Sequence, residues 1–287
     1  MNTSFMKGFY KMTKEELALE VIDRLKKEYP LADCTLDYDE AWKLLVSVRL
    51  AAQCTDARVN VVVQDLYARY PDVAALAAAT PEEIEAIVKP CGLGKSKARD
   101  ISACMKILHE KYHDNVPCDF DALLALPGVG RKSANLIMGD VFGKPAIVTD
   151  THCIRLTNRI GLVDGIKDPK KVEMALWKII PPEEGNDFCH RLVNHGREVC
   201  TARTRPYCDR CCLADICAKR SRLKQRLSAG YAGFKAPYKK EAFSPGYFLE
   251  NASFYGYSPT LLLNANIKIF SNPTLTAIMT IVHANRS

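Results

Sequence analysis

The sequence of 287 residues lacks the long apolar runs that a membrane-spanning protein needs. No stretch reaches about 18 consecutive apolar residues, so we expect no transmembrane helix. The N-terminal stretch 1–25 has no apolar core and no small-residue cleavage site, and we therefore predict no signal peptide. Without such a leader the default compartment is a reducing one, where structural disulfides are rare.

Strand signals are nearly absent from the first 220 residues. The apolar stretch 146–148 is too short to count, and no alternating runs bounded by turns occur. Apolar residues recur instead at helical spacing after N-capping signals. Thr13 with Glu16 forms one capping box, and Thr80 with Glu83 forms another. The predicted fold class is therefore all-α, and we find no internal repeat.

Other capping signals place further helix ends. Residues 96–112 have the amphipathic period of a helix. We expect Asp39 to cap a helix that runs through Trp42 and Val48. The next helix should begin at Thr55 or Asp56, and Asp119 should cap a short helix that ends at Leu126.

Length and composition are those of a globular protein with room for two domains. Hydrophobic residues make up 48% and charged residues 25%, and the net charge is +7. A basic balance weakly favours nucleic acid or another polyanion as the partner. The composition changes near residue 222 and becomes basic, aromatic and rich in helix breakers. We expect residues 223–287 to be a flexible or poorly packed appendage.

The segment LPGVGRKSAN, residues 126–135, predicts a helix end, a tight turn and a new helix. Gly128 and Gly130 permit the turn and the close approach of another backbone. The amides at the start of the second helix, near Arg131, would form an anion site, and a DNA phosphate is the natural ligand for a basic protein. Such a hairpin would hold DNA without reading its sequence.

Lys132 lies in the first turn of that second helix. The helix dipole and partial burial both favour a neutral amine there, and a neutral lysine is a nucleophile suited to Schiff-base formation. A simple phosphate contact is the commoner role, and these residues alone favour it. Asp150 follows 18 residues later as a typical N-cap. A turn at 142–145 could return its carboxylate to Lys132, where it could take a proton or stabilise developing positive charge.

Five of the twelve cysteines gather between Cys200 and Cys217, whereas the other seven are scattered like small buried hydrophobes. The spacing Cys200-x7-Cys208-x2-Cys211-x5-Cys217, with Cys212 as an extra, is a strong metal signal. Both zinc and a [4Fe–4S] cluster fit it. A single x2 pair with short, uneven loops gives the iron–sulfur cluster a modest lead. The basic residues nearby suit either a phosphate contact or a solvated face.

Together these motifs resemble the endonuclease III family. The likeness is carried by LPGVGRKSAN, the aspartate of TDTH, NHGREVC and the cysteine cluster. AAQCTDARVN (51–60) and GLGKSKARDI (92–101) extend it over residues 12–220. The resemblance implies a helix-hairpin-helix DNA glycosylase with lyase activity, which removes oxidised pyrimidines in base excision repair and cleaves 3′ to the abasic site.

The resemblance also implies two all-α domains. A six-helix barrel with the hairpin would span 34–144, and an iron–sulfur cluster domain would join the N-terminal helix, 1–33, to residues 145–222. Double-stranded DNA with damaged bases or abasic sites would lie across the cleft between them. The protein would be a monomer, without membrane contact, in a bacterial-type cytoplasm and associated with the nucleoid through DNA.

Specific roles follow from the same likeness. Lys132 would attack C1′ of the damaged nucleotide with help from Asp150. Gln53 would fill the gap left by the flipped base, and Leu93 would wedge the opposite strand. The implied cluster ligands are Cys200, Cys208, Cys211 and Cys217, and the implied DNA-binding residues are Gln53, Leu93, Gly128, Gly130, Arg131, Ser133 and His152.

The sequence departs from the family pattern at three places. The first cysteine loop has seven residues where six is usual, so Cys212 competes as a ligand. Leu124 stands where some relatives carry an acidic residue, and 223–287 has no familiar counterpart. Two other functions stay open. One is a monofunctional mismatch glycosylase of the same superfamily, against which Lys132 argues, and the other is a non-catalytic DNA-binding module.

Overall fold

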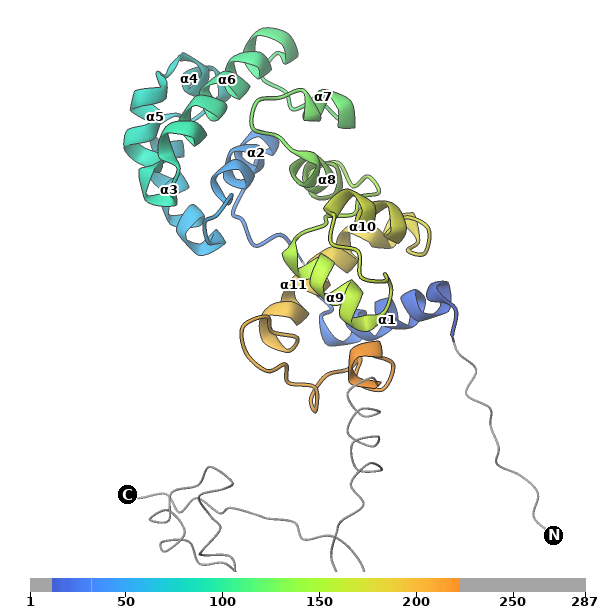
Figure 1. Ribbon diagram of the computed structural model, residues 1–287. Helices are drawn as coiled ribbons and strands as arrows, with labels where there is room; N and C mark the ends of the chain where they lie inside the picture. Colours follow the sequence, from blue (N-terminus) through green and yellow to red (C-terminus); the bar gives the residue numbers. More distant parts are fainter. Residues whose placement is uncertain (1–11, 32, 222–287) are drawn as a thin grey trace, which may run out of the picture. The chain divides into compact units, whose positions relative to one another are not determined.

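The computed structural model describes residues 12–31 and 33–221, which lie within one compact unit, Met1–Ala229. The appendage predicted over 223–287 lies outside the described residues. These described ranges contain helices and no strand (Figure 1), which confirms the all-α prediction. In chain order the helices are α1 (Lys14–Glu28), α2 (Ala41–Leu50), α3 (Asp56–Arg69), α4 (Val73–Ala78), α5 (Pro81–Val88), the 3₁₀ turn η1 (Lys89–Cys91), α6 (Gly94–Tyr112), α7 (Phe120–Leu124), α8 (Arg131–Asp140), α9 (Thr151–Ile160), α10 (Pro169–Leu176), the 3₁₀ turn η2 (Pro182–Glu184) and α11 (Gly185–Glu198).

Capping signals fixed several helix starts correctly. Thr13 and Glu16 form the predicted capping box at α1, and Thr80 and Glu83 form the second at α5. Each box satisfies two backbone amides that have no acceptor within the helix. Thr55 caps α3 by accepting from the amide of Arg58.

The prediction that Asp39 caps the second helix is wrong. The N-cap of α2 is Glu40, whose side chain makes no capping bond. The Asp39 carboxylate instead pairs with the Lys43 ammonium at 2.7 Å. An acidic residue near a helix start can therefore form an ion pair with a basic side chain four residues later, instead of accepting a hydrogen bond from a backbone amide.

Two predicted helix bounds shift by two residues. The helix α6 begins at Gly94 rather than at residue 96, because Leu93 adopts a left-handed conformation and turns the chain into the helix early. The short helix α7 is capped by Asp119 as predicted, yet it ends at Leu124 and leaves Leu126 in the turn. Both shifts occur beside segments that matter for the site described below.

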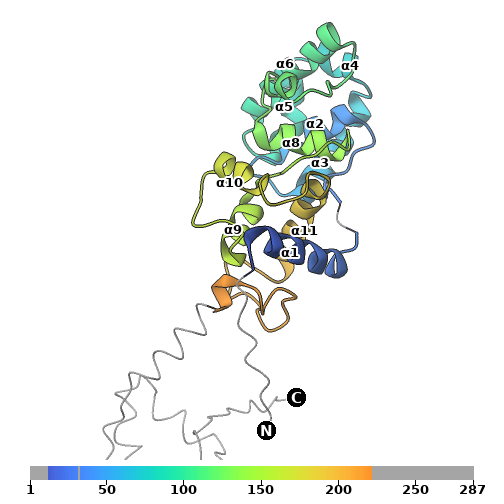
Figure 2. The same ribbon diagram turned by 90° about the vertical axis from the view of Figure 1, so that its right-hand side faces the viewer.

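Two separate hydrophobic cores organise these helices. Helices α2 to α8 enclose the first, around residues such as Leu66 and Leu108, and α1 joins α9, α10 and α11 around the second, which includes Phe188. Figures 1 and 2 both show α1 beside α11, so the ends of the described chain share one core. The domain bounds at 34, 145 and 223 are not decided by this arrangement and stay predictions.

The helix α8 connects the two cores. Its apolar side packs in the first core, while its polar side chains reach α10 and α11 of the second. Arg131 forms a two-pronged ion pair with the buried Glu173 of α10, at 2.6 and 2.8 Å. At the other end of α8, Asp140 accepts hydrogen bonds from Asn186 and His190 of α11, both at 2.8 Å. The hairpin helix is therefore held at the junction.

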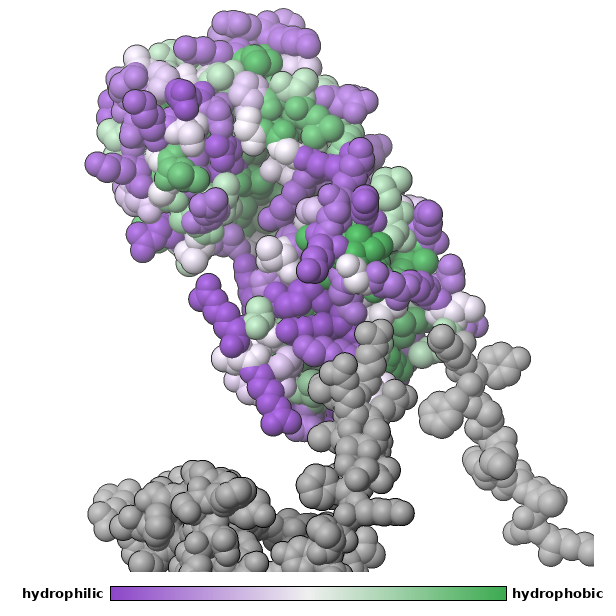
Figure 3. Space-filling view, viewed as in Figure 1, coloured by the Kyte–Doolittle hydropathy of each residue, from purple (hydrophilic) through white to green (hydrophobic). Residues whose placement is uncertain are grey.

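The surface of the described part is mostly polar. Figure 3 shows hydrophilic side chains over much of one face, with hydrophobic areas interspersed among them. No helix within residues 12–31 or 33–221 is long and apolar enough to cross a membrane.

Candidate functional site

The hairpin turn requires glycine at position 128. Gly128 has a φ of +76°, and a β-carbon there would lie 2.8 Å from the Arg49 side chain and 2.9 Å from that of Asp100. Arg49 and Asp100 are themselves joined by an ion pair at 2.6 Å, so this floor beneath the turn resists displacement. The predicted tight turn thus rests on both backbone conformation and packing.

Gly130 has a different environment. It is the N-cap of α8 with an ordinary φ of −99°, and a β-carbon there would meet open space. No side chain caps this helix start. The amides of the first turn, from Arg131 to Ser133, therefore have no partner within the helix and can bind an anion.

Lys132 is the second residue of α8, as expected, but the predicted partial burial is wrong because the side chain is exposed. The first turn of α8 faces solvent at this point. The positive charge of Lys132 contributes to the lowered pKa values of both Asp56 and His152, so its ammonium lies close to these two side chains.

Asp150 is the N-cap of α9, and its Oδ1 accepts a 2.7 Å hydrogen bond from the amide of Cys153. The capping role predicted for it is confirmed. Its negative charge acts on the same His152 imidazole as the Lys132 charge does. Asp150 lies two residues before His152, so its charge and that of Lys132 both act on this imidazole, and the predicted approach of the Asp150 carboxylate to Lys132 stays a prediction.

His152 is held as a neutral imidazole. Burial is the main cause of its lowered pKa, and the charges of Arg155, Arg197 and Lys132 act in the same direction against that of Asp150. Arg155 Nη2 lies 3.1 Å from His152 Nδ1 and also donates to the carbonyl of Gly196 at 3.1 Å. A β-carbon at Gly196 would collide with this ring.

An ion pair between Asp56 of α3 and Arg197 of α11 spans the two cores beside the lysine, at 2.7 Å. Thr35 also donates to Asp56, at 2.6 Å. Burial acts to raise the pKa of Asp56, but these two hydrogen bonds and the nearby positive charges outweigh it and lower the pKa. Sequence reasoning missed these residues, although both lie within motifs quoted for the family resemblance, in AAQCTDARVN and NHGREVC.

The predicted DNA-binding residues do not all present free side chains. The Arg131 guanidinium is already bound to Glu173 and also lies 5.0 Å from the centre of the Phe120 ring. If Arg131 contacts DNA, its backbone amide rather than its side chain would make the contact. Ser133 is half-buried in the first turn of α8, beside the exposed Lys132.

Gln53 and Leu93 are both exposed and both strained. Their φ angles are +57° and +51°, in the left-handed region that residues other than glycine rarely adopt. Leu93 leaves 55% of its surface exposed, unlike a core leucine. Such strain persists only where the surrounding structure imposes it, and it gathers at functional sites.

The cysteine segment wraps around Arg159 of α9. Cys200 Sγ accepts a hydrogen bond from Arg159 Nη1 at 3.2 Å, and Cys217 Sγ donates to the Arg159 carbonyl at 3.3 Å. Burial raises the pKa of the Cys211 thiol to about 12, and the charges of Cys212, Cys200 and Cys217 raise it further. Three of the four predicted ligands therefore lie close to one another.

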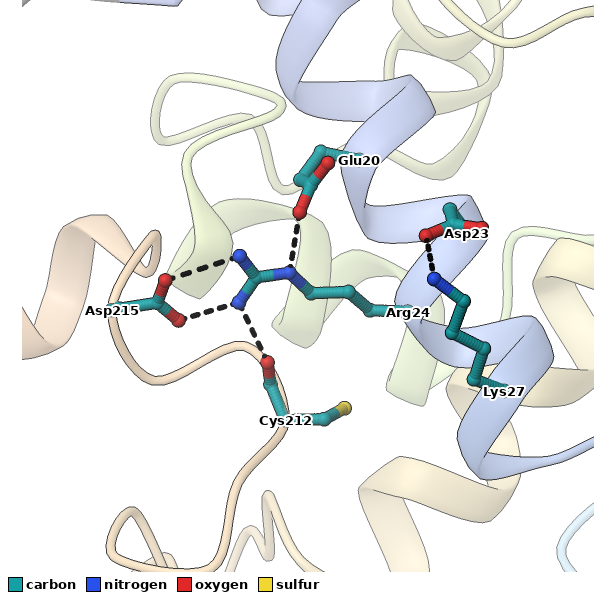
Figure 4. Close-up of polar contacts among 6 residues, drawn as sticks. All are labelled: Glu20, Asp23, Arg24, Lys27, Cys212 and Asp215. Carbon is teal, nitrogen blue, oxygen red and sulfur yellow. Dashed lines mark hydrogen bonds and ion pairs between the residues drawn. The ribbon is translucent and has the colours of Figure 1, made fainter.

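The fifth cysteine faces another environment. Figure 4 shows Arg24 of α1 bound to Asp215 and to the carbonyl of Cys212, with hydrogen bonds of 2.5, 3.1 and 2.9 Å. Burial raises the pKa of the Cys212 thiol, and the charges that act on it come from Glu28, Arg24 and Asp215. This cysteine is thus oriented toward α1, whereas Cys211 is surrounded by the other thiols.

The cysteine thiols could serve either a zinc ion or a [4Fe–4S] cluster. In the described part of the chain, no three or more Cys, His, Asp or Glu side chains are grouped so that they could hold a metal ion. Four thiolates on one zinc would need sulfur atoms about 4 Å apart, because each Zn–S bond is about 2.3 Å. A [4Fe–4S] cube spaces its ligands more widely, since each thiolate binds a different iron.

Comparisons with known proteins identify the family of the chain. Residues 46–182 match the HhH-GPD superfamily of base excision DNA repair proteins. An endonuclease III of Synechocystis sp. is 44% identical over 207 residues, which is 71% of this chain and 93% of the relative. The chain belongs to the endonuclease III family. The Escherichia coli endonuclease III is 39% identical over 199 residues, 69% of this chain and 93% of that relative.

A solved structure supports the same assignment. The structure titled a trapped endonuclease III–DNA covalent intermediate superposes with a TM-score of 0.69 and 38% identity. It covers 74% of this chain and 99% of that one. The predicted family and fold are therefore confirmed, and the protein is a base excision repair DNA glycosylase.

Proposed function

We propose that this protein removes oxidised pyrimidines from double-stranded DNA and then cuts the strand 3′ to the abasic site. The observation that carries the proposal is the exposed Lys132 at the uncapped start of α8, with Asp150 at the start of α9 and the charges of both acting on His152. Nucleophilic attack on a sugar of DNA requires an amine, a carboxylate and a nearby site for the phosphate anion.

The hairpin would bind the backbone of the duplex. The first-turn amides of α8 would hold a phosphate, with Gly130 leaving room for its approach. The damaged base would leave the stack, at lower cost when it is poorly stacked. Gln53 would occupy the gap and Leu93 would wedge the opposite strand, a role that suits their exposed and strained conformations. His152 would line the pocket near the sugar.

The chemical steps follow from the two catalytic residues. Lys132 must lose a proton before it attacks, and Asp150 is the acceptor because the cap bond uses only its Oδ1. The amine then bonds to C1′ as the bond to the base breaks, and the base leaves with a proton. The ring-opened sugar forms a Schiff base with Lys132. Loss of a C2′ proton then expels the 3′ phosphate by β-elimination.

A related chain supports the covalent step. The solved structure that matches over most of the described residues is titled as a trapped covalent intermediate with DNA. A second one is titled as a non-covalent complex of endonuclease III with DNA, at a TM-score of 0.69. These titles describe the relatives, and the exposed Lys132 at the start of α8 is the residue of this chain that we assign to the same step.

We also propose that Cys200, Cys208, Cys211 and Cys217 hold a [4Fe–4S] cluster. The wrapping of the cysteine segment around Arg159 and the mutual influence of three thiols support this ligand set. When bound, the cluster would join the loops of residues 200–217 to one another, next to Arg159 of α9. The bacterial origin of the relatives named above supports a bacterial-type cytoplasm as the proposed compartment, and the monomeric state stays a prediction.

Borohydride trapping tests the function. With an abasic-site duplex, the protein should form a reduced covalent adduct, and Lys132→Ala should form none. Lys144→Ala, which removes an exposed lysine just after α8, is the matched control and should trap normally. Base release without trapping by the unaltered protein would favour a monofunctional glycosylase. Binding without either reaction would favour a non-catalytic module.

A further inference from the structure

Lys97 is a fully buried cation in the first core. It lies in α6 with 0% of its surface exposed. Burial lowers the pKa of its ammonium group. Placing a lysine in an apolar core is costly unless its donors are satisfied, so this position requires a structural reason.

Its hydrogen bonds supply that reason. Lys97 Nζ donates to the carbonyl of Leu50 at 2.8 Å and to the carbonyl of Cys91 at 3.0 Å. Leu50 is the last residue of α2, and Cys91 is the last residue of η1. One ammonium therefore binds the carbonyls of two residues that are 41 positions apart in sequence. Each of these carbonyls lies at the C-terminal end of its element.

The two strained residues follow these carbonyls within three positions of the chain. Gln53 follows Leu50 by three residues, and Leu93 follows Cys91 by two. The backbone amide of Lys97 also donates to the carbonyl of Leu93, at 3.1 Å. Both strained loops are thus fixed to the same side chain and its helix.

The other strained residues of the described chain have an ordinary explanation. His113 and Asp114, with φ of +50° and +66°, follow the last residue of α6 and end that helix. Left-handed residues are common at helix C-termini. Gln53 lies in the short link between α2 and α3, and Leu93 is the N-cap of α6, a position where a left-handed residue is unusual and needs an external restraint.

We propose that Lys97 is a positioning residue that fixes the spacing between Gln53 and Leu93 and so controls how readily the enzyme opens duplex DNA. The inference rests on the proposed function, in which these two side chains fill and wedge the duplex. Lys97 touches neither DNA nor the reacting atoms. Without its ammonium, the two carbonyls lose their shared donor, and each loop can relax out of its left-handed conformation.

The test is Lys97→Met, which keeps the length of the side chain and removes the charge. The control is Ser102→Ala in the same helix, because Ser102 is also buried and bonds a backbone carbonyl, that of Ala79, away from both loops. Excision of one oxidised pyrimidine is measured in a duplex and in a single strand, where no opening is needed. Thermal unfolding is recorded for each variant.

Lys97→Met should slow excision from the duplex at least about tenfold relative to excision from the single strand, a difference of about 1.4 kcal/mol. Ser102→Ala should leave that ratio unchanged. In a Gln53→Gly, Leu93→Gly background, Lys97→Met should change the ratio less than about twofold, because coupled residues are not additive. Should Lys97→Met not fold, Lys97→Gln replaces it: its amide keeps donors but is uncharged and too short to join both carbonyls, so the same fall in the ratio of duplex to single-strand excision is expected and an unchanged ratio would overturn the inference.

Equal loss on both substrates, or a lower melting temperature with an unchanged ratio, would overturn the inference. Full additivity in the glycine background would overturn it as well. Failure of the proposed function would look different, because the unaltered protein would then release no base from either substrate and would not be trapped by borohydride.

Discussion

Arg155 Nη2 lies 3.1 Å from Nδ1 of His152, and this contact fixes the protonation state of the imidazole. Arginine has only donors, so Nδ1 must be the acceptor and the proton of the neutral ring must lie on Nε2. The same guanidinium group also donates to the carbonyls of Gly196 and Cys200. The ring beside Lys132 and Asp150 is thereby oriented from the side of the cysteine segment.

The first prediction concerns pH. Burial and then the nearby cations lower the pKa of His152 in the folded protein, against about 6.5 in the unfolded chain. Its contribution to stability is therefore complete above about pH 6.5 and is lost as the pH falls through the folded pKa. Arg155→Met should raise the pKa of His152 in an NMR titration, and Arg155→Lys should raise it less. A lower pKa in Arg155→Met would contradict this account.

The second prediction separates the two hairpin glycines. Gly128→Ala should destabilise the protein by about 2 kcal/mol or more, because of its φ of +76° and the collision with Arg49. Gly130→Ala should melt like the unaltered protein, since its β-carbon meets open space. It should nevertheless bind duplex DNA at least about fivefold more weakly, through loss of a phosphate contact worth about 1 kcal/mol. Melting and binding curves of both variants decide the matter.

The third prediction distinguishes capping from catalysis at Asp150. Asp150→Ala should lose about 1 kcal/mol of stability with the bond to the Cys153 amide, while Asp150→Asn should keep it, because asparagine caps helices equally well. Both variants should lose at least about 100-fold in base excision, as expected for a missing general base. If Asp150→Asn retained full activity at normal stability, the catalytic role would be excluded.

The fourth prediction assigns the cluster ligand. Cys211→Ala should abolish the absorbance near about 400 nm that iron–thiolate ligation gives, and Cys212→Ala should retain it. The reason is that the charges of Cys200 and Cys217 act on the Cys211 thiol, whereas the charges that act on the Cys212 thiol come from Glu28, Arg24 and Asp215. Iron content measured on both variants completes the comparison. The opposite pair of results would show that the seven-residue loop shifts the ligand set.

Local patterns made most of the fold predictable from the sequence. A capping box such as Thr13 with Glu16, or the glycine turn before Lys132, depends on residues within one or two turns of chain. The confirmed hypothesis that Asp150 caps a helix needed only the local sequence before α9, whereas its approach to Lys132 stays a prediction. Exposure was less predictable, and Lys132 proved exposed because its surroundings depend on how distant helices pack.

The contacts that arrange the site were invisible to sequence reasoning for the same reason. Lys97 reads as one more basic residue of GLGKSKARDI, yet it is fully buried because the ends of α2 and η1 present carbonyls to it. The space for His152 depends on Gly196, 44 positions away. Such roles arise from the meeting of remote segments, which no local period records.

The packing of α1 against α11 has a consequence for biosynthesis. The helix α1 precedes the whole first core along the chain, yet its partners α9 and α11 follow that core. During synthesis, Val21, Ile22 and Leu25 therefore stay without their final partners while the first core is made. The second core can close only after translation passes residue 198, so the two cores are completed in a fixed order.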